Sequence, residues 1–301
     1  MSTERVIALG FFDGVHLGHA ALLRLAFETG AARGLRPAAM TFDEHPLNRI
    51  SGSRVPLLTK PEDRVALIRE ISGIEETIVL HFNDAFMQTP WEQFLDSLTE
   101  EYGVGHIVCG HDYSCGYRGE GTAEKLGARC LSLGIGFDMV EPVVVNGERV
   151  SSSRIRALVS DGQMEEAAAL YGHPHMLSGI VRTGKRLGRT IGAPTINQRF
   201  DRDLIVPRHG VYASVVTLPD GRRMHGVTNV GVRPTVEDTT VVNAETCILG
   251  FDGDLYGQTV RLELLSFVRP EMKFSGLEEL KNQIHADAEH VSRYFEGKEM
   301  A

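Results

Sequence analysis

The rhythm of apolar residues changes once along this chain, and that change limits its possible folds more than any other feature. From Val6 to about Val145, short apolar runs alternate with amphipathic stretches, which is typical of strands and helices alternating around a parallel sheet. The expected strands include residues 6–12, 37–42, 76–80 and 106–110, and the expected helices include 19–32 and 60–71. A doubly wound layer of this kind binds ligands at the carboxyl ends of its strands.

After residue 175 the pattern consists mainly of strand-like segments. They lie at residues 176–183, 210–218, 223–231, 244–251 and 256–267. Asp220-Gly221 and Asp252-Gly253 have the composition of hairpin turns. This half is therefore predicted to form a small antiparallel barrel.

A single long helix is expected to close the chain, over residues 275–295. Ser275 and Glu278 have the spacing of a capping box, and the face expected to be apolar consists of Leu277, Leu280, Ile284 and Val291. Between the two halves, the sequence predicts a helix, a turn at Asp161-Gly162 and a second short helix. We place the domain boundary after this pair, which gives domains of residues 1–173 and 174–301.

Composition limits the kinds of partner that the protein can be expected to bind and the compartment in which it is expected to occur. A length of 301 residues suits two domains, and a net charge of −9 argues against a protein that coats nucleic acid or an anionic membrane. The four cysteines have no C-x-x-C spacing, and the N-terminal apolar stretch is broken by Gly10 and Asp13. We expect a reduced, cytoplasmic protein with no nucleic-acid or membrane partner, in which any anionic ligand is held locally.

The segment from Gly10 to His19, GFFDGVHLGH, joins the first expected strand to the first expected helix. Glycines at such a turn let the backbone approach a phosphate, the helix N-terminus offers partial positive charge, and His16 and His19 can donate hydrogen bonds. The segment therefore predicts a nucleotide site with Gly10, Phe11, Asp13 and Gly14 in its loop. Considered alone, the two histidines could equally satisfy polar groups of a turn.

The surrounding residues favour the nucleotide site. HxGH after a strand resembles the signature of the nucleotidyltransferase superfamily, and FDGVHLGH resembles its FAD synthetase branch. The later segment VSSSRIR resembles the ISSTxIR motif of the same family. The resemblance implies a Rossmann-like α/β domain, catalytic roles for His16 and His19, and contacts of Ser152, Ser153 and Arg156 with ATP phosphates.

Two further segments, TFDEHP and GHDYSCG, resemble the flavin side of that family. They imply Phe42 and Tyr113 as ring contacts and Asp112 as a polar anchor. Cys115 stands where the family commonly has phenylalanine, and Ala20 stands where it commonly has glutamine.

A glycine-rich, basic segment, TGKRLGRTIGAPTIN, begins the second half at Thr183. It lacks the order of a Walker loop, so a different phosphate cradle is expected. Its glycines allow close approach of the backbone to phosphates, and Thr195 and Asn197 offer neutral oxygens of the kind that bind Mg²⁺ already held by a nucleotide.

GxxxGRxxGxPTxN resembles the signature of riboflavin kinases, and the likeness continues through most of residues 176–274. It implies nucleotide contacts of Gly184, Arg189 and Gly192, metal contacts of Thr195 and Asn197, and a catalytic base at Glu245. Cys247 stands where this family usually has histidine.

Together the resemblances indicate a bifunctional FAD synthetase of the bacterial type. Such an enzyme phosphorylates riboflavin to FMN with release of ADP, then adenylylates FMN to FAD with release of pyrophosphate, using ATP and Mg²⁺ in both reactions. Two alternatives stay open at this point: a chain that retains only one activity, and a non-catalytic protein that senses flavin or nucleotide. The sequence predicts no oligomeric state.

Overall fold

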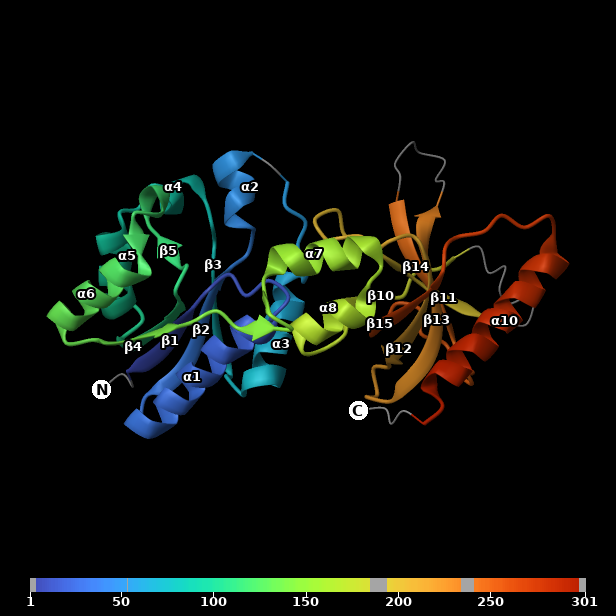
Figure 1. The fold of residues 1–301 in the computed structure, drawn as a ribbon, viewed down its shortest axis with the longest axis horizontal. Helices are drawn as coiled ribbons and strands as arrows, with labels where there is room; N and C mark the ends of the chain where they lie inside the picture. The colour runs from blue at the N-terminus through green and yellow to red at the C-terminus, as the bar shows by residue number, and fades with distance from the viewer. Residues whose placement is uncertain (1–3, 53, 185–193, 234–240, 298–301) are drawn as a thin grey trace. The chain divides into compact units, whose positions relative to one another are not determined.

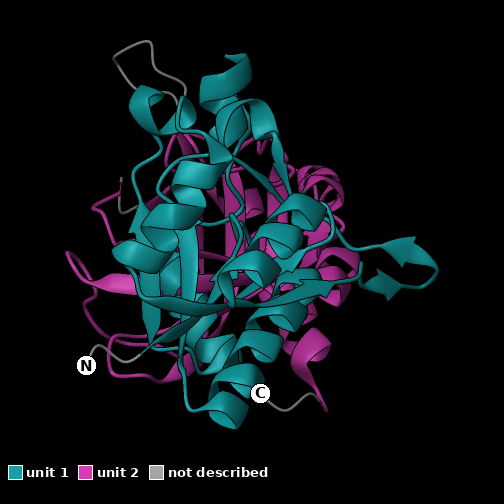
Figure 2. Ribbon diagram, turned by 90° about the vertical axis from the view of Figure 1, so that its left-hand side faces the viewer, with its two compact units in different colours: residues 1–152 teal, residues 153–301 magenta. Residues whose placement is uncertain are grey.

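The computed structural model describes residues 4–52, 54–184, 194–233 and 241–297. These residues form two compact units, 1–152 and 153–301, which are coloured separately in Figure 2. Each unit has its own sheet and its own core.

The first unit is built on a parallel five-stranded sheet. Its strands, in spatial order, are β3 (Glu76–Leu80), β2 (Arg36–Phe42), β1 (Arg5–Leu9), β4 (Val104–Gly110) and β7 (Gly136–Val140). The predicted parallel layer is thus confirmed, although β1 ends at Leu9 and not at Phe12. The chain turns after this strand, where Phe12 has φ of 54° and so lies outside the β region.

Helices cover this sheet (Figure 1). The longer ones are α1 (Leu17–Arg33), α3 (Pro61–Ser72), α5 (Trp91–Glu100) and α6 (Ala123–Leu133). One core cluster joins alternate residues of β1, β2 and β4, such as Ile7 and Met40, to Leu95 of α5 and Leu126 of α6. Helices α1 and α3 contact each other and the sheet. Shorter elements are α2 (Pro46–Ser51), α4 (Asp84–Met87), β5 (Ser114–Cys115), η1 (Tyr117–Gly119), β6 (Gly121–Thr122), β8 (Val144–Val145) and β9 (Glu148–Arg149).

The second unit begins with α7 (Ser152–Asp161) and α8 (Met164–Tyr171), separated by Gly162 with φ of 80°, as the sequence predicts. Its sheet is an antiparallel half-barrel. The strands, in spatial order, are β10 (His175–Ile180), β15 (Thr259–Arg269), β12 (Gly210–Thr217), β13 (Arg223–Arg233), β14 (Val241–Ile248) and β11 (Thr195–Arg199). The predicted antiparallel class is confirmed.

A few hydrogen bonds connect the outer strands β10 and β11. The buried amide of Gln198 on β11 donates to the carbonyl oxygens of Gly179 and Val260, at 3.1 and 3.0 Å. Just beyond β10, the N–H of Arg182 donates to the carbonyl of Asn197 at 2.8 Å. These bonds fix β11, the strand that carries two predicted metal-binding residues.

Two predictions about turns and caps need correction. Asp220-Gly221 does connect the paired strands β12 and β13, but Asp252-Gly253 is not a hairpin turn, because β14 and β15 are not neighbours in the sheet. The predicted capping box is also wrong. Ser275 bonds to the carboxylate of Glu279 at 2.7 Å and not to Glu278, and the helix α10 (Leu277–Phe295) begins after Gly276.

The buried stripe of α10 begins later than predicted. Leu277 is 56% exposed, whereas Val291 and Phe295 are buried against β12 and β13. Asp287 also lies in this stripe, where it accepts two hydrogen bonds from the guanidinium of Arg269 at 2.7 and 2.8 Å. A paired charge therefore occupies a position that apolar periodicity assigns to a hydrophobic residue.

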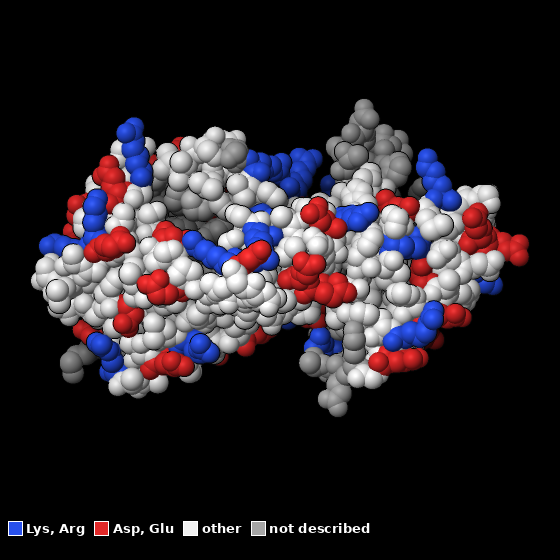
Figure 3. Space-filling view, in the orientation of Figure 1, with Lys and Arg blue, Asp and Glu red and all other residues white. Residues whose placement is uncertain are grey.

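Surface charge is mixed on the face drawn in Figure 3, where the described acidic and basic side chains are interspersed. No helix of the described residues is long and apolar enough to cross a membrane. An anionic ligand on such a surface needs donors supplied locally, by a loop or a helix terminus.

One buried histidine makes the stability of the second unit sensitive to pH. His175 is 3% exposed and lies 3.2 Å from the hydroxyl of Tyr171, and burial, with the nearby His173, lowers its pKa to about 4. In the unfolded chain a histidine has a pKa of about 6.5. Above pH 6.5 His175 is neutral in both the folded and the unfolded state, and its contribution to the free energy of unfolding is complete. As the pH falls from 6.5 towards 4, only the unfolded state binds the proton, so this contribution is lost.

We therefore expect the free energy of unfolding of the second unit to fall by about 2 kcal/mol between pH 8 and pH 5 because of His175 alone. Denaturant unfolding at both pH values, followed in the full chain and in His175→Phe, measures this contribution. The substituted chain should show a shallower pH dependence. Equal slopes in the two proteins would contradict the assignment.

Candidate active sites

The turn after β1 is held in an uncommon backbone conformation. Val15 has φ of 41° and Gly14 has φ of 80°, and a positive φ is costly for a β-branched residue such as valine. The turn is anchored by Asp13, which is 1% exposed. Its carboxylate accepts hydrogen bonds from the N–H groups of Leu58 and Thr59, at 2.9 and 3.0 Å. Asp13 therefore contributes to this site by fixing the loop.

His16 and His19 lie together at the start of α1. The Nδ1 atom of His16 accepts a hydrogen bond from the N–H of His19 at 3.2 Å, which caps the helix. The two rings stack with centroids 3.6 Å apart and planes 13° apart. Because Nδ1 of His16 is an acceptor, the neutral ring carries its proton on Nε2, where it can be donated to a ligand.

A cavity of about 200 Å³ opens beside these histidines. Its walls come from the start of α1, the ends of β4 and β7, and the segment before α7: His16, Gly18, His19, Leu22, Gly110, His111, Asp112, Val140, Glu141, Pro142, Val143, Arg149, Val150, Ser151 and Ser152. The hydroxyl of Ser152 donates to the carbonyl of Asp13 at 3.1 Å. The histidines and Ser152, the second serine of the VSSSRIR motif, are thus brought together, as predicted.

The other predicted nucleotide contacts occupy two places. Gly10 and Phe11 belong to the turn after β1, and the N–H of Gly10 donates to the carbonyl of Met40 at 3.2 Å. Ser153 and Arg156 lie on α7 within the second unit.

The predicted flavin contacts do not all lie in one group. Phe42, at the end of β2, packs edge-on against Phe82 and Phe86, with ring centroids 5.2 and 5.3 Å apart. Tyr113 packs against the same core cluster as Phe86. Phe42, Phe82 and Phe86 form an aromatic group at the carboxyl end of the sheet.

Asp112 is exposed and lines the cavity beside the histidines. Its carboxylate forms an ion pair with Arg149 at 2.5 Å. Sequence reasoning did not identify Arg149, although an arginine just before the serine motif was a signal that could have indicated it. The pair places one positive and one negative charge at the edge of this cavity.

A second arginine missed from the sequence, Arg64 of α3, is fully buried. Its guanidinium lies 4.2 Å from the centroid of the Phe11 ring and donates to the carbonyl of Phe42 at 2.7 Å and the hydroxyl of Thr41 at 3.1 Å. Desolvation lowers its pKa to about 10, so it remains a cation at neutral pH. The amphipathic pattern of α3 gave no sign of a charged residue on the buried face.

In the second unit, Glu245 lies on β14, between β11 and β13. It pairs with Asn197 on one neighbouring strand and with Asn229 on the other. Residues directly opposite on adjacent strands share a face, so the carboxylate stands between two amides. A small cavity of about 50 Å³ lies here, lined by Asn197, Asn229, Gly231, Val232, Asn243 and Glu245.

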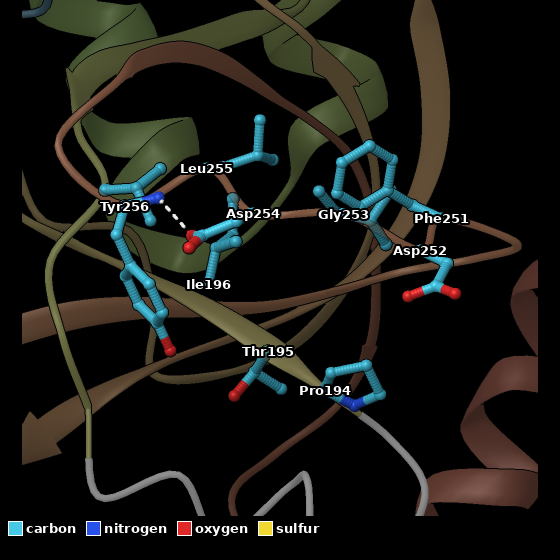
Figure 4. Close-up of a pocket in the computed structure, with 11 residues that line it drawn as sticks. Pro194, Thr195, Ile196, Phe251, Asp252, Gly253, Asp254, Leu255 and Tyr256 are labelled. Atoms are coloured by element: carbon cyan, nitrogen blue, oxygen red, sulfur yellow. Dashed lines mark hydrogen bonds between the residues drawn. The ribbon is translucent and has the colours of Figure 1, made fainter.

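Thr195 links this group to a larger cavity. Its hydroxyl donates to the carboxylate of Glu245 at 2.7 Å. Thr195 also lines a cavity of about 470 Å³, shown in Figure 4, together with Pro194, Ile196 and the loop after β14 from Phe251 to Tyr256. In that loop the N–H of Tyr256 donates to the carboxylate of Asp254 at 3.0 Å. The volume and the apolar walls suit a small-molecule ligand.

Gly184 lies against the amide of Asn197. A Cβ atom at Gly184 would stand 2.5 Å from Nδ2 of that amide, so only glycine leaves room for it. Arg189 and Gly192 lie outside the described residues. The predicted base and both predicted metal contacts are therefore brought together, whereas two of the predicted nucleotide contacts have no described position.

Cys247 is on the same face of β14 as Glu245 and is half-buried. Burial raises the pKa of its thiol. The thiolate, which is the nucleophilic form, is therefore disfavoured, and Cys247 acts as a packing residue beside the carboxylate.

Comparison with known proteins assigns a family to each half. The model of the FAD synthetase family matches residues 1–154, and the model of the riboflavin kinase family matches residues 171–295. A structure from Streptococcus pneumoniae, titled as a macrolide-efflux protein, is similar with a TM-score of 0.83 and 30% identity, over 97% of this chain and 95% of that chain.

Full-length relatives share one name, bifunctional riboflavin kinase/FMN adenylyltransferase. The protein of Listeria monocytogenes is 35% identical over 97% of this chain and 93% of its own length, and that of Bacillus subtilis is 36% identical over the same shares. The protein of Escherichia coli K12 is 33% identical over 96% of this chain and 92% of its own length. The chain therefore belongs to the family of bifunctional riboflavin kinase/FMN adenylyltransferases and is an enzyme with these two activities.

Proposed function

We propose that adenylyl transfer from ATP to FMN takes place beside His16 and His19, and that phosphoryl transfer from ATP to riboflavin takes place beside Glu245. One observation carries the proposal: each unit, taken by itself, has its own polar group next to a cavity. Two reactions that both consume ATP can then use separate sites in one chain.

In the first unit, a phosphate oxygen of FMN attacks the α-phosphorus of ATP, and the bond to pyrophosphate breaks. Negative charge grows on the α-phosphate and on the leaving group. The Nε2–H of His16, the ring of His19 and the N-terminus of α1 offer donors and positive potential fixed in advance. Ser152, which lines the cavity beside these histidines, is proposed to bind the ATP phosphates. The contacts of Ser153 and Arg156 with these phosphates remain predictions from the sequence motif.

Substrate binding in this unit is divided between two groups. The loop from Gly10 to Gly14 is proposed to let the backbone approach the nucleotide, with Asp13 holding the loop from behind. The aromatic group around Phe42, together with Tyr113, is proposed to contact the isoalloxazine ring. Asp112 is proposed as a polar anchor. Because it lies beside the histidines, its proposed place is where FMN and ATP meet.

In the second unit, the terminal ribityl hydroxyl of riboflavin attacks the γ-phosphorus of ATP. Glu245 accepts the hydroxyl proton, and ADP leaves. The hydrogen bond from Thr195 holds one oxygen of the carboxylate and leaves the other to face the substrate. The adenine is proposed to occupy the larger cavity near Ile196 and Leu255. Gly184 is proposed to lie near the phosphates, and the nucleotide contacts of Arg189 and Gly192, which lie outside the described residues, remain predictions from the sequence.

Mg²⁺ is proposed to accompany ATP, and the donors present fit it. Thr195 offers a hydroxyl and Asn197 an amide, which are hard oxygen ligands that bind Mg²⁺ together with phosphate oxygens and water. Among the described residues, no group of three or more His, Cys, Asp or Glu could hold a metal by itself. When bound, the ion would neutralise charge on the phosphates, and the protein supplies only part of its coordination shell.

The predicted domain limits, 1–173 and 174–301, remain a proposal. The FAD synthetase match ends at residue 154 and the riboflavin kinase match begins at 171, so α7 and α8 lie mostly between the two matches. The cytoplasmic location predicted from the cysteine pattern also remains a prediction.

His19→Ala should abolish FAD formation and leave FMN formation unchanged, because the imidazole serves only the first unit. We expect a loss of about 10²-fold or more in kcat for adenylyl transfer. Chromatography of flavins made from riboflavin and ATP measures both products in one sample. A protein that only senses flavin would make neither product even without substitution, and loss of both products in folded His19→Ala would contradict separate sites.

Glu245→Gln should have the opposite effect. The amide keeps the shape of the carboxylate but cannot accept the proton, so riboflavin phosphorylation should fall by about 10²-fold to 10⁴-fold. FAD formation from supplied FMN should continue at the normal rate, which is the control for intact protein. Kinase activity that is unchanged in this variant would exclude Glu245 as the base.

Thr195→Val removes a hydroxyl and keeps the size of the side chain. The Mg²⁺ concentration for half-maximal kinase activity should rise by about tenfold, while the Mg²⁺ dependence of FAD formation from FMN should not change. Titration of both activities with Mg²⁺, after removal of metal with a chelator, makes the comparison. An identical titration of kinase activity in the two proteins would exclude Thr195 as a ligand.

A further inference from the structure

Arg64 is a cation enclosed in the first unit. Its side chain is among the largest fully buried side chains of the described residues. Charged residues are seldom fully buried unless a group of opposite charge pairs with them, because removing a charge from water is costly. The carboxylates of Asp13, Asp43 and Glu62 attract this cation electrostatically. Within the part of the chain that the structure describes, its Nε and Nη2 atoms nevertheless have no hydrogen-bond partner.

The contacts that Arg64 does make join two substrate loops. A single nitrogen, Nη1, donates to the hydroxyl of Thr41 at 3.1 Å and to the carbonyl of Phe42 at 2.7 Å. Thr41 in turn donates to the carbonyl of Phe11 at 2.7 Å. The guanidinium also lies 4.2 Å from the centre of the Phe11 ring, at the distance of a cation–π contact.

These bonds cross from one strand end to the next. Phe11 follows β1 in the loop proposed for the nucleotide, and Phe42 ends β2 beside the rings proposed for the flavin. Packing alone does not call for a charge at this position, since apolar residues of similar volume often stabilise a core as well as a buried charge does. The buried cation is therefore best explained by the two segments that it connects, the loop after β1 and the end of β2.

We infer that Arg64 is a positioning residue for adenylyl transfer, which holds the loop after β1 and the end of β2 in a fixed relation so that ATP and FMN meet correctly. The inference rests on the proposed adenylyltransferase site in the first unit. Arg64 contacts neither cavity lining nor a predicted catalytic side chain directly, and it acts through Phe11, Thr41 and Phe42. Small displacements between reacting groups reduce rates strongly, so such a contact affects the reaction without touching it.

The test compares three single substitutions in the full chain. Arg64→Met removes the charge and retains most of the volume. Arg64→Lys keeps a cation and one nitrogen able to donate to both Thr41 and Phe42. Ile68→Ala is the matched control, because Ile68 is fully buried on the same helix and carries no polar contact.

Steady-state kinetics of FAD formation from supplied FMN and ATP should be measured well below each protein's melting temperature. We expect Arg64→Met to lower kcat/KM for FMN by about 30-fold or more and to change KM for ATP by less than about threefold, because the hydrogen bonds from Leu58 and Thr59 to Asp13 still hold the nucleotide loop when the arginine is absent. Arg64→Lys should stay within about fivefold of the parent, and Ile68→Ala within about twofold, although its melting temperature falls.

The outcomes separate the inference from its alternatives. If Arg64→Met behaves like Ile68→Ala, or if Arg64→Lys is as impaired as Arg64→Met, the positioning role is wrong. If Arg64→Met does not fold, Thr41→Val decides, because it removes the hydroxyl bridge to Phe11 and should also lower kcat/KM for FMN by about tenfold; unchanged kinetics would overturn the inference. Failure of the unsubstituted chain to make FAD would instead refute the proposed function.

Discussion

The buried carboxylate of Asp13 is the interaction on which the first active site depends. It accepts hydrogen bonds from two consecutive N–H groups, those of Leu58 and Thr59, and so holds a turn that contains a valine with positive φ. Without this anchor the turn would relax to a lower-energy backbone, and the helix start that follows would no longer place its two stacked imidazoles beside a cavity. The cost of the strained backbone is offset by hydrogen bonds to a carboxylate that is itself buried.

The two candidate sites are built in different ways. In the first, a parallel sheet gathers loops and a helix N-terminus at one edge, so that the donors come mainly from backbone ends and from the residues next to them. In the second, the polar groups stand on three adjacent strands of an antiparallel sheet, where strand pairing places Asn197 and Asn229 on either side of Glu245. Neighbouring residues of a loop and a helix start make up most of the first site, whereas the register of paired strands brings together the residues of the second.

The sequence predicted the fold class of both halves, because periodicity distinguishes alternating strands and helices from consecutive strands. It also predicted the groups around His16 and Glu245, since these lie in short motifs with recognisable spacing. It failed where the relevant partner is distant in the sequence. Arg64 and Asp287 occupy buried faces through contacts that no local pattern specifies. The capping box failed for a local reason, because Ser275 bonds to Glu279 and not to Glu278.

The arrangement around Glu245 also restricts where the gene can tolerate insertions and deletions. On β14 the neighbouring Thr246 points to the opposite face, where a buried chain of hydroxyls runs from Ser214 through Thr228 to Thr246 with contacts of 2.8 Å. A shift of one residue in any of these strands would exchange the two faces, burying the carboxylate and exposing the hydroxyl chain. Single-residue insertions and deletions within β11, β13 and β14 should therefore be purged by selection, and length variation among homologous genes should be confined to the loops that join these strands.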